Sequence, residues 1–104
     1  MRKTTQLRKL LEKGEIIIAP GAYDVLSAKL IEQAGFQAIY MTGAGVASSQ
    51  LGVPDIGLIT MTEMVTQAKN IVNATNIPVI SDADTGYGNA INVMRTIREF
   101  EKAG

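Results

Sequence analysis

The chain has 104 residues, enough for one small domain and too few for two. Hydrophobic residues make up 46% of it and charged residues 19%, a globular composition that excludes extensive disorder. Ten basic and ten acidic side chains cancel, which argues against a nucleic-acid partner because binding a polyanion requires a basic surface. Cysteine and histidine are absent, so a metal ion would need oxygen ligands, and catalysis would rest on carboxylates, hydroxyls, lysines or backbone groups.

The N-terminal segment shows no targeting or membrane signal. A secretory signal needs an apolar stretch of roughly 7–15 residues, and a membrane-spanning helix needs about 20. The basic and polar start, Met1–Leu7, is followed by neither. We therefore expect a cytoplasmic protein without a membrane partner.

The first half of the chain alternates helical and strand-like patterns. Leucines at helical spacing predict a helix over residues 5–13, with Gly14 as its C-cap. The apolar, β-branched run Ile16–Ala19 predicts the first strand, of the kind buried on both faces. Apolar residues at every fourth position predict a second helix over residues 22–34, and residues 36–41 form the second predicted strand.

The second half continues this alternation. Residues 42–59 are rich in glycine and serine without a clear period, and we predict a loop there. Thr60–Glu63 has the pattern of a capping box and begins an amphipathic helix. Residues 77–81 form the third predicted strand. The special loop at residues 82–89 then leads into a final amphipathic helix.

One helix followed by three strand–helix pairs predicts an α/β fold with a parallel sheet covered by helices. The spacing fits a doubly wound sheet and a (β/α)8 barrel equally well. Three parallel strands leave two open edges, and a fourth strand is expected where the sequence reaches Gly104. Because a barrel of this type needs about 250 residues, we expect residues 1–104 to form a single partial domain of a longer protein.

Asp82 and Asp84 form the strongest candidate site, directly after the third predicted strand. The alternation of side chains along a strand would send both carboxylates to the same face. Neighbouring carboxylates repel unless a cation or a shared proton lies between them, and magnesium prefers such oxygen ligands. Active sites of barrels lie at the carboxyl ends of strands. The alternative is that one aspartate, or Asn89, merely caps the next helix.

The segment Tyr40–Ser49, at the end of the second predicted strand, is the second candidate site. Its small residues expose backbone amides that can bind a carboxylate or a phosphate, although they would equally suit a close-packed turn. Gly43 and Gly45 also begin a dinucleotide-binding fingerprint, but Ser48 occupies the third glycine position and no acidic residue ends a strand about 20 residues later. Binding of NAD is therefore the weakest hypothesis. Asp55, after a proline, is either a third acid or a turn former.

Taken together, four motifs resemble the isocitrate lyase/phosphoenolpyruvate mutase superfamily, and methylisocitrate lyases and carboxyvinyl-carboxyphosphonate phosphorylmutase-like proteins most of all. They cover the chain from about Leu7 onward in the family's order and spacing. The motifs are Pro20–Asp24, Tyr40–Gly45, Leu51–Asp55 and Asp82–Gly88. The resemblance implies that the chain is the N-terminal portion of a TIM-type (β/α)8 barrel, with about three of its parallel strands. Asp82 and Asp84 match the family's magnesium-site aspartates, so Mg²⁺, or Mn²⁺ in its place, is the implied cofactor.

The resemblance also implies roles in substrate binding and catalysis. Thr42, Gly43 and Ala44 match the loop that holds the carboxylate of the 2-oxo acid portion. Tyr40 matches a tyrosine beside the reacting oxygen, and Asp55 matches the active-site acid after the Leu-Gly-x-Pro turn. The commonest lyase pattern has serine at position 42 and glycine at position 44. These two differences leave the identity of the substrate open.

The implied activity is that of a lyase that cleaves a small 2-hydroxy tricarboxylate, such as methylisocitrate, into pyruvate and succinate. A divalent ion would stabilise the charge that develops during this cleavage. Implied alternatives are a phosphoenolpyruvate mutase-like reaction and the hydrolysis or decarboxylation of oxaloacetate or other 2-oxo acids. The family implies a small carboxylic acid as ligand and a homo-oligomeric assembly.

The family's lyases donate a proton from a cysteine in a Lys-Lys-Cys-Gly-His loop after the fourth strand. This chain contains no cysteine, so we expect residues 1–104 alone to lack activity. A hypothesis from another class is a non-catalytic half-barrel that folds on pairing with another chain or a copy of itself. The open sheet edges suggest it.

Overall fold

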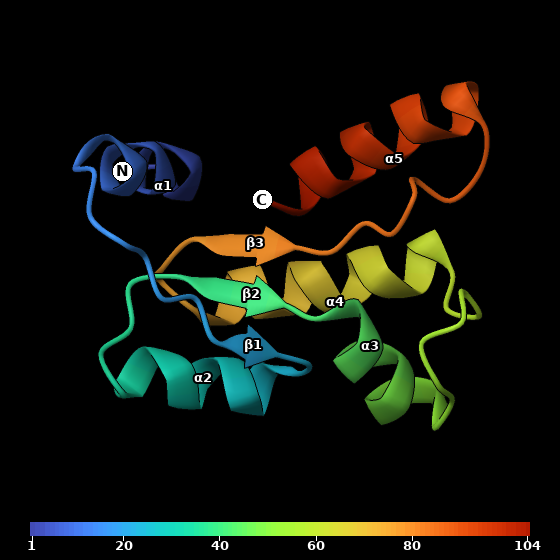
Figure 1. Cartoon of the computed structure of the whole chain (residues 1–104), viewed down its shortest axis with the longest axis horizontal. Helices are drawn as coiled ribbons and strands as arrows, with labels where there is room; N and C mark the ends of the chain where they lie inside the picture. The colour runs from blue at the N-terminus through green and yellow to red at the C-terminus, as the bar shows by residue number, and fades with distance from the viewer.

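Three short parallel strands form the centre of the structure, a computed structural model that describes residues 1–104 (Figure 1). They are β1 (Gly21–Ala22), β2 (Ile39–Met41) and β3 (Val79–Ser81), paired in the order β1-β2-β3. A helix separates each strand from the next along the chain, so each parallel pair is joined by a crossover connection. This arrangement confirms the predicted α/β class and its parallel sheet.

The register of the strands gives the sheet two different faces. Ala22 of β1 pairs with Met41 of β2, and both are fully buried. Ile39, two residues before Met41 and on the same face of the sheet, is also fully buried. The intervening row contains Tyr40 paired with Ile80, whose exposures are 36% and 38%. Successive residues of a strand point to opposite faces. One face therefore carries the core, and the other is open to solvent.

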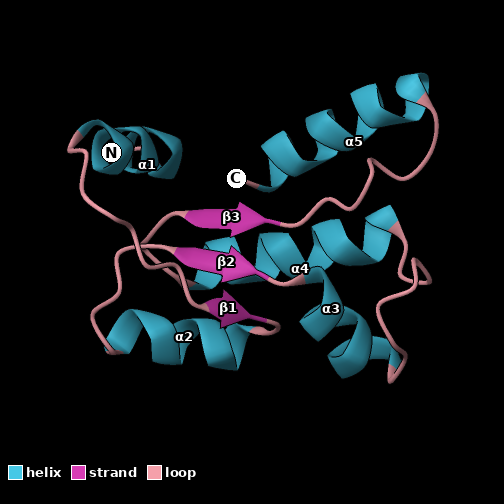
Figure 2. Cartoon of the chain, in the orientation of Figure 1, coloured by secondary structure: helices cyan, strands magenta, loops and turns pink.

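Four longer helices surround the sheet (Figure 2). Their bounds are α1 (Lys3–Glu12), α2 (Val25–Gln33), α4 (Met61–Ala74) and α5 (Ala90–Ala103). Helices α2 and α4 cover the buried face of the sheet, and α5 packs against α4 beside the β3 edge (Figure 1). None of the helices has the length and apolar character that crossing a bilayer requires.

The core lies between the sheet and helices α2 and α4. Its largest fully buried side chains come from both layers, namely Ile39, Met41, Val46, Met64 and Ile71. By contrast, no residue of α1 is buried. Helix α1 is tethered instead through the Lys3 ammonium, which donates to the carbonyls of Val72 and Thr75 at the end of α4.

Capping boxes begin the three helices that follow the strands. The Thr60 hydroxyl accepts from the Glu63 N–H at 3.2 Å, and the Glu63 carboxylate accepts from the Thr60 N–H at 3.0 Å. This confirms the predicted start of α4. Asp24 and Asn89 make equivalent reciprocal bonds at the starts of α2 and α5. The alternative reading that Asn89 caps the next helix is thus correct, whereas Asp82 and Asp84 are not N-caps.

The first predicted strand is wrong in position. The sheet begins at Gly21, and the apolar run before it lies outside the ladder, with Ile16 94% exposed and Ile18 65% exposed. The Pro20 carbonyl accepts from the Tyr40 N–H at 3.0 Å, so the pairing between this segment and β2 begins only at Pro20. A β-branched run favours extended backbone, but hydrogen-bonding partners decide which residues form a strand.

The predicted loop over residues 42–59 is helical in its first half. It contains α3 (Gly43–Val46), capped by the Thr42 hydroxyl, and a π-helical turn, η1 (Ala47–Leu51), that ends at the left-handed Gly52. These elements are too short to display an apolar period, which is why the sequence pattern did not reveal them.

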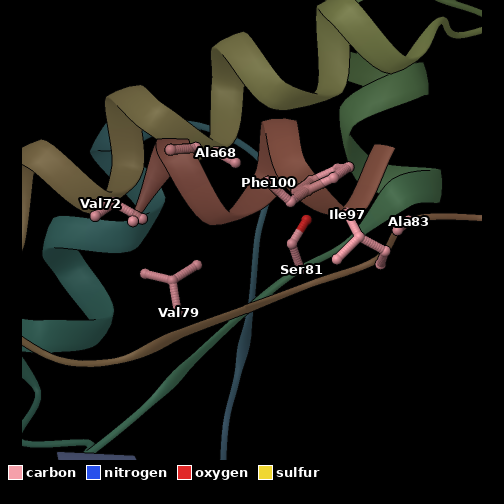
Figure 3. A pocket seen from close by; sticks show the side chains of 9 residues that line it. Ala68, Val72, Val79, Ser81, Ala83, Ile97 and Phe100 are labelled. Carbon is pink, nitrogen blue, oxygen red and sulfur yellow. The ribbon is translucent and has the colours of Figure 1, made fainter. Parts of the chain in front are cut away.

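An apolar cavity of about 220 Å³ lies where α4, α5 and the β3 edge meet (Figure 3). Val79, Ile97 and Phe100 line it together with small residues, and Ser81 supplies its one side-chain hydroxyl. A cavity with so few polar groups lacks the convergent donors and charges that fix a polar substrate. We therefore place the candidate chemistry elsewhere, at the carboxyl ends of the strands.

Candidate active site

The carboxyl ends of the three strands point the same way (Figure 1), and Thr42 and Asp82 directly follow β2 and β3. The Thr42 N–H donates to the Ala22 carbonyl at 3.1 Å, and the Asp82 N–H donates to the Met41 carbonyl at 3.1 Å. Both residues thus continue the ladder one step beyond their strands. The sheet itself fixes where the backbones of Thr42 and Asp82 lie.

Both carboxylate oxygens of the half-buried Asp82 have defined surroundings. Oδ1 accepts a hydrogen bond from the Asp84 N–H at 2.7 Å, which closes a turn of the Asx type. Oδ2 lies against Gly43, where a Cβ atom would stand 2.6 Å from it. A side chain at position 43 would occupy the space of the carboxylate. Glycine at this position therefore lets the second strand's loop approach Asp82 closely.

Asp84 lies in a turn beyond the strand, so strand geometry does not determine where its side chain lies. The strand ends at Ser81, and Asp84 is exposed in the left-handed region with φ +47°. The alternation of side chains along a strand therefore does not apply to Asp82 and Asp84, and that part of the prediction is wrong. Asp84 joins Asp82 through the tight turn, since a short polar side chain tolerates this backbone conformation.

Three carboxylates line one small cavity of about 60 Å³, which we call the acid cavity. Its lining residues are Gly43, Ala47, Asp55, Gly57, Ile59, Asp82, Asp84 and Tyr87. No basic side chain lies within ion-pairing distance of these carboxylates, because the sole ion pair joins Lys102 and Glu99 on α5 at 3.5 Å. The fold therefore gathers negative charge here without neutralising it.

Asp55 combines both roles that the sequence left open. The Ile56 N–H donates to the Pro54 carbonyl at 2.9 Å, so Asp55 stands at the centre of a three-residue turn. Its side chain lines the acid cavity opposite the loop that follows β3. The turn thus places Asp55 at the rim of the cavity that Asp82 and Asp84 also line.

Tyr40 lies on the open face of the sheet, one residue before the end of β2. Burial raises the pKa of its phenol above the usual value, and the nearby carboxylates of Asp82 and Asp55 raise it further. The phenol is neutral at pH 7 and can donate a hydrogen bond at the edge of the site. The structure thus brings Tyr40 and the predicted acids together.

Only one of the three predicted carboxylate-binding residues lines the acid cavity. That residue is Gly43, whereas the Thr42 hydroxyl accepts from the Gly45 N–H at 3.1 Å and Ala44 is exposed. A Cβ atom at position 45 would stand 2.4 Å from Cγ2 of Thr42. Close packing therefore accounts for Gly45 and weakens the dinucleotide reading of this segment.

Tyr87 is a member of the site that the sequence analysis missed. It is held between two glycines with φ +61°, a left-handed conformation that is rare for a bulky residue. Burial raises the pKa of its phenol to about 12, with smaller contributions from Asp82 and Asp84. Its place in a Gly-Tyr-Gly sequence was the available signal, because such strained positions cluster at functional sites.

The phenol of Tyr87 predicts a loss of stability at high pH. The folded state favours the neutral phenol, so this contribution is complete below the unfolded pKa of about 10 and is lost as the pH rises toward about 12. We expect urea unfolding at pH 9 and pH 11 to show a smaller decline for Tyr87→Phe than for the unaltered chain. The ultraviolet titration of Tyr87→Phe should also lack the phenol with the highest midpoint. Equal declines in the two proteins would contradict this assignment.

The carboxylate oxygens available as metal ligands suit a magnesium ion that retains several waters. No three acidic side chains come close enough to hold one ion jointly. Magnesium typically binds one or two carboxylates and completes its octahedron with water and substrate. The Asp84 N–H occupies Oδ1 of Asp82, and Asp84 itself is exposed beside it. These two residues therefore fit the ion better than a cage of three acids would.

A parallel α/β sheet with unpaired carboxylates at the carboxyl ends of its strands defines the class of enzymes built on (β/α) units. The comparison with known proteins gives the family: the chain belongs to the phosphoenolpyruvate phosphomutase family, whose pattern matches residues 7–104. This confirms the resemblance seen in the sequence, and with it the α/β fold shared with the barrel members of this superfamily.

The chain is similar along its whole length to several enzymes. It is 57% identical over 104 residues to the 2,3-dimethylmalate lyase of Eubacterium barkeri, with 100% of this chain and 36% of that protein covered. It is 50% identical over 98 residues to the 2-methylisocitrate lyase of Aeropyrum pernix, with 94% and 32% covered. The solved structure of phosphonopyruvate hydrolase in complex with oxalate and Mg²⁺ superposes with a TM-score of 0.95 at 38% identity, with 100% and 36% covered. The chain thus spans about a third of the length of these proteins.

Proposed function

We propose that this chain carries the magnesium-binding and carboxylate-binding part of a lyase that cleaves a carbon–carbon bond in a small 2-hydroxy acid. The observation that carries the proposal is the acid cavity, which Asp55, Asp82 and Asp84 line without an ion-pair partner. Similarity to two lyases of 2-hydroxy acids supports the choice of reaction.

The proposed substrate has a 2-methylmalate core. The compounds named for the two lyases, 2,3-dimethylmalate and 2-methylisocitrate, share this core and differ in the group on carbon 3. Cleavage between carbons 2 and 3 removes the proton of the 2-hydroxyl and releases pyruvate from either compound, and the other fragment leaves as a carbanion beside its own carboxylate that then takes up a proton. The higher identity, 57%, favours the smaller dimethylmalate-like substrate over a tricarboxylate.

Asp82 and Asp84 would hold the magnesium ion at the end of β3. Bound there, the ion would supply positive charge to the 2-hydroxyl and the adjacent carboxylate of the substrate. Asp82 is the better placed of the two, because its turn with the Asp84 N–H holds Oδ1 and leaves Oδ2 for the site. Asp84 and Asp55 would act mainly through bound waters, since both are exposed.

Tyr40 would orient the reacting oxygen of the substrate. Its raised pKa keeps the proton on the phenol, so the hydroxyl donates to the oxygen on carbon 2 as that oxygen gains and loses charge. Gly43 would give the Asp82 carboxylate room against the loop after β2, where a Cβ atom would stand 2.6 Å from Oδ2, and so would let that acid face the substrate. These residues bind and orient the 2-oxo acid half of the substrate.

Chemistry at a carbon–phosphorus bond is the second candidate, because phosphonopyruvate hydrolase superposes over the whole chain with a TM-score of 0.95. Its identity of 38% is well below the 57% shared with dimethylmalate lyase. The cleavage of a carbon–carbon bond is therefore the better supported reaction.

Oxalate tests the proposal on the 104-residue chain, since it resembles the enolate of pyruvate and is present with Mg²⁺ in the phosphonopyruvate hydrolase structure. We expect calorimetry to show that oxalate binds when Mg²⁺ is present and that Mg²⁺ removal abolishes the binding. Asp82→Ala combined with Asp84→Ala should abolish it as well. Glu12→Ala combined with Glu15→Ala is the matched control, because both glutamates are exposed and lie outside the acid cavity. Oxalate binding in the absence of Mg²⁺, or unchanged oxalate binding by the variant without the two aspartates, would refute the proposal.

A further inference from the structure

A second polar cavity lies directly beside the acid cavity. It has a volume of about 420 Å³ and opens between the first turns of α4 and α5. Its lining residues are Gly57, Leu58, Ile59, Thr60, Met61, Thr62, Tyr87, Asn92, Arg95 and Thr96. Gly57, Ile59 and Tyr87 also line the acid cavity. These three residues form a shared wall between the two cavities.

The two cavities carry opposite charge. Arg95 is the only charged residue that lines the second cavity, and its guanidinium makes no ion pair. The carboxylate of Glu63 is turned back onto the N–H and hydroxyl of Thr60, and that of Glu99, four residues after Arg95, pairs with Lys102. An arginine without a carboxylate partner, facing a cavity free of acids, has its donors available for a ligand.

Hydrogen bonds hold the shared wall in place. The buried Thr96 hydroxyl donates to the Gly86 carbonyl at 2.7 Å and so ties the loop that carries Tyr87 to α5. Arg95 directly precedes Thr96 in the same helix. This hydrogen bond therefore holds the backbone beside Tyr87 against the turn of α5 that carries Arg95.

We propose that the second cavity is a binding site for a small oxyanion, either a carboxylate or a phosphate, separate from the acid cavity. The guanidinium of Arg95 pairs with two oxygens of the anion, the geometry that favours arginine over lysine at such sites. The Thr62 hydroxyl, which makes no hydrogen bond within the protein, donates to a third oxygen. Tyr87 lies between this site and the cavity of the three aspartates, because it lines both.

Titrations followed by amide NMR test this site without magnesium. Acetate and inorganic phosphate are added to the 104-residue chain in separate experiments, at constant ionic strength maintained with chloride. We expect saturable shifts at Thr62 and Arg95, and the anion with the lower dissociation constant identifies the preferred chemistry. Arg95→Gln should weaken binding by about tenfold or more, as the loss of a charge-assisted pair predicts. Arg98→Gln, an exposed arginine on the same helix, should leave it unchanged.

Two results would overturn the proposal. One is the absence of saturable shifts with both anions, and the other is an equal effect of Arg95→Gln and Arg98→Gln, which would indicate general charge attraction. The double replacement Asp82→Ala and Asp84→Ala separates this proposal from the lyase proposal. Oxyanion binding that persists in that variant supports the second site even if magnesium binding proves absent. Loss of oxyanion binding there would show that the two cavities are one site.

Discussion

Asp82→Asn is expected to weaken Mg²⁺ binding by the 104-residue chain by about a hundredfold, which corresponds to roughly 2.7 kcal/mol. Asp82 is the half-buried acid of the cavity, whereas Asp55 and Asp84 are exposed. Asparagine keeps the size of the side chain and an oxygen that can accept from the Asp84 N–H, the bond that measures 2.7 Å in the structure. The replacement therefore removes the charge and preserves the turn. Calorimetric titration with MgCl2 measures the effect.

Asp55→Asn and Asp84→Asn provide the matched comparison. Each removes one negative charge from the same cavity, so a purely electrostatic attraction would weaken binding equally in all three variants. We expect smaller losses at these exposed positions, because water screens their charge. Thermal unfolding of the three variants should agree closely with that of the unaltered chain. Magnesium affinity that is the same in Asp82→Asn as in the unaltered chain would remove the basis for a metal site at β3.

The sequence predicted those elements of the fold that are long enough to show a period or carry a cap. Thr60 and Glu63 located the start of α4 because their reciprocal hydrogen bonds depend only on local chain geometry. The run Ile16–Ala19 was misleading because apolar β-branched residues favour extended backbone wherever they occur. Whether such residues join a sheet depends on a distant partner, here the second strand, which pairs from Pro20 onward. The residues of this run alone do not determine that register.

The candidate site was predicted residue by residue, but its geometry was not. Asp82 and Asp84 were recognised as a pair, yet the reason given, the alternation of a strand, does not hold past Ser81. The contribution of Tyr87 depends on a left-handed backbone and on the tie between its loop and Thr96. Both arise from packing of the loop on α5, which is a tertiary feature. Residue types can therefore indicate which side chains belong to a site, whereas the arrangement of those side chains depends on tertiary contacts.

Gly43→Ala is expected to weaken Mg²⁺ and oxalate binding by about ten- to a hundredfold, the range found when groups that support metal ligands are altered. The added Cβ atom would stand 2.6 Å from Oδ2 and 3.0 Å from Cγ of Asp82, so the carboxylate must move. Metal–ligand distances tolerate shifts of only about 0.2 Å. Alanine itself suits the helical position at the start of α3, and the helix should form as before.

A second variant separates displacement of Asp82 from a general disturbance of the loop. In Gly43→Ala combined with Asp82→Asn, the carboxylate that the methyl group displaces is already uncharged. We expect this double variant to bind Mg²⁺ no more weakly than Asp82→Asn alone, since two changes that act through one group are not additive. Additive losses would mean that Gly43 contributes through its own backbone, as a direct contact of the ligand. The close approach of Gly43 to Asp82 would then be a consequence of packing, and the two strand ends would serve the site independently.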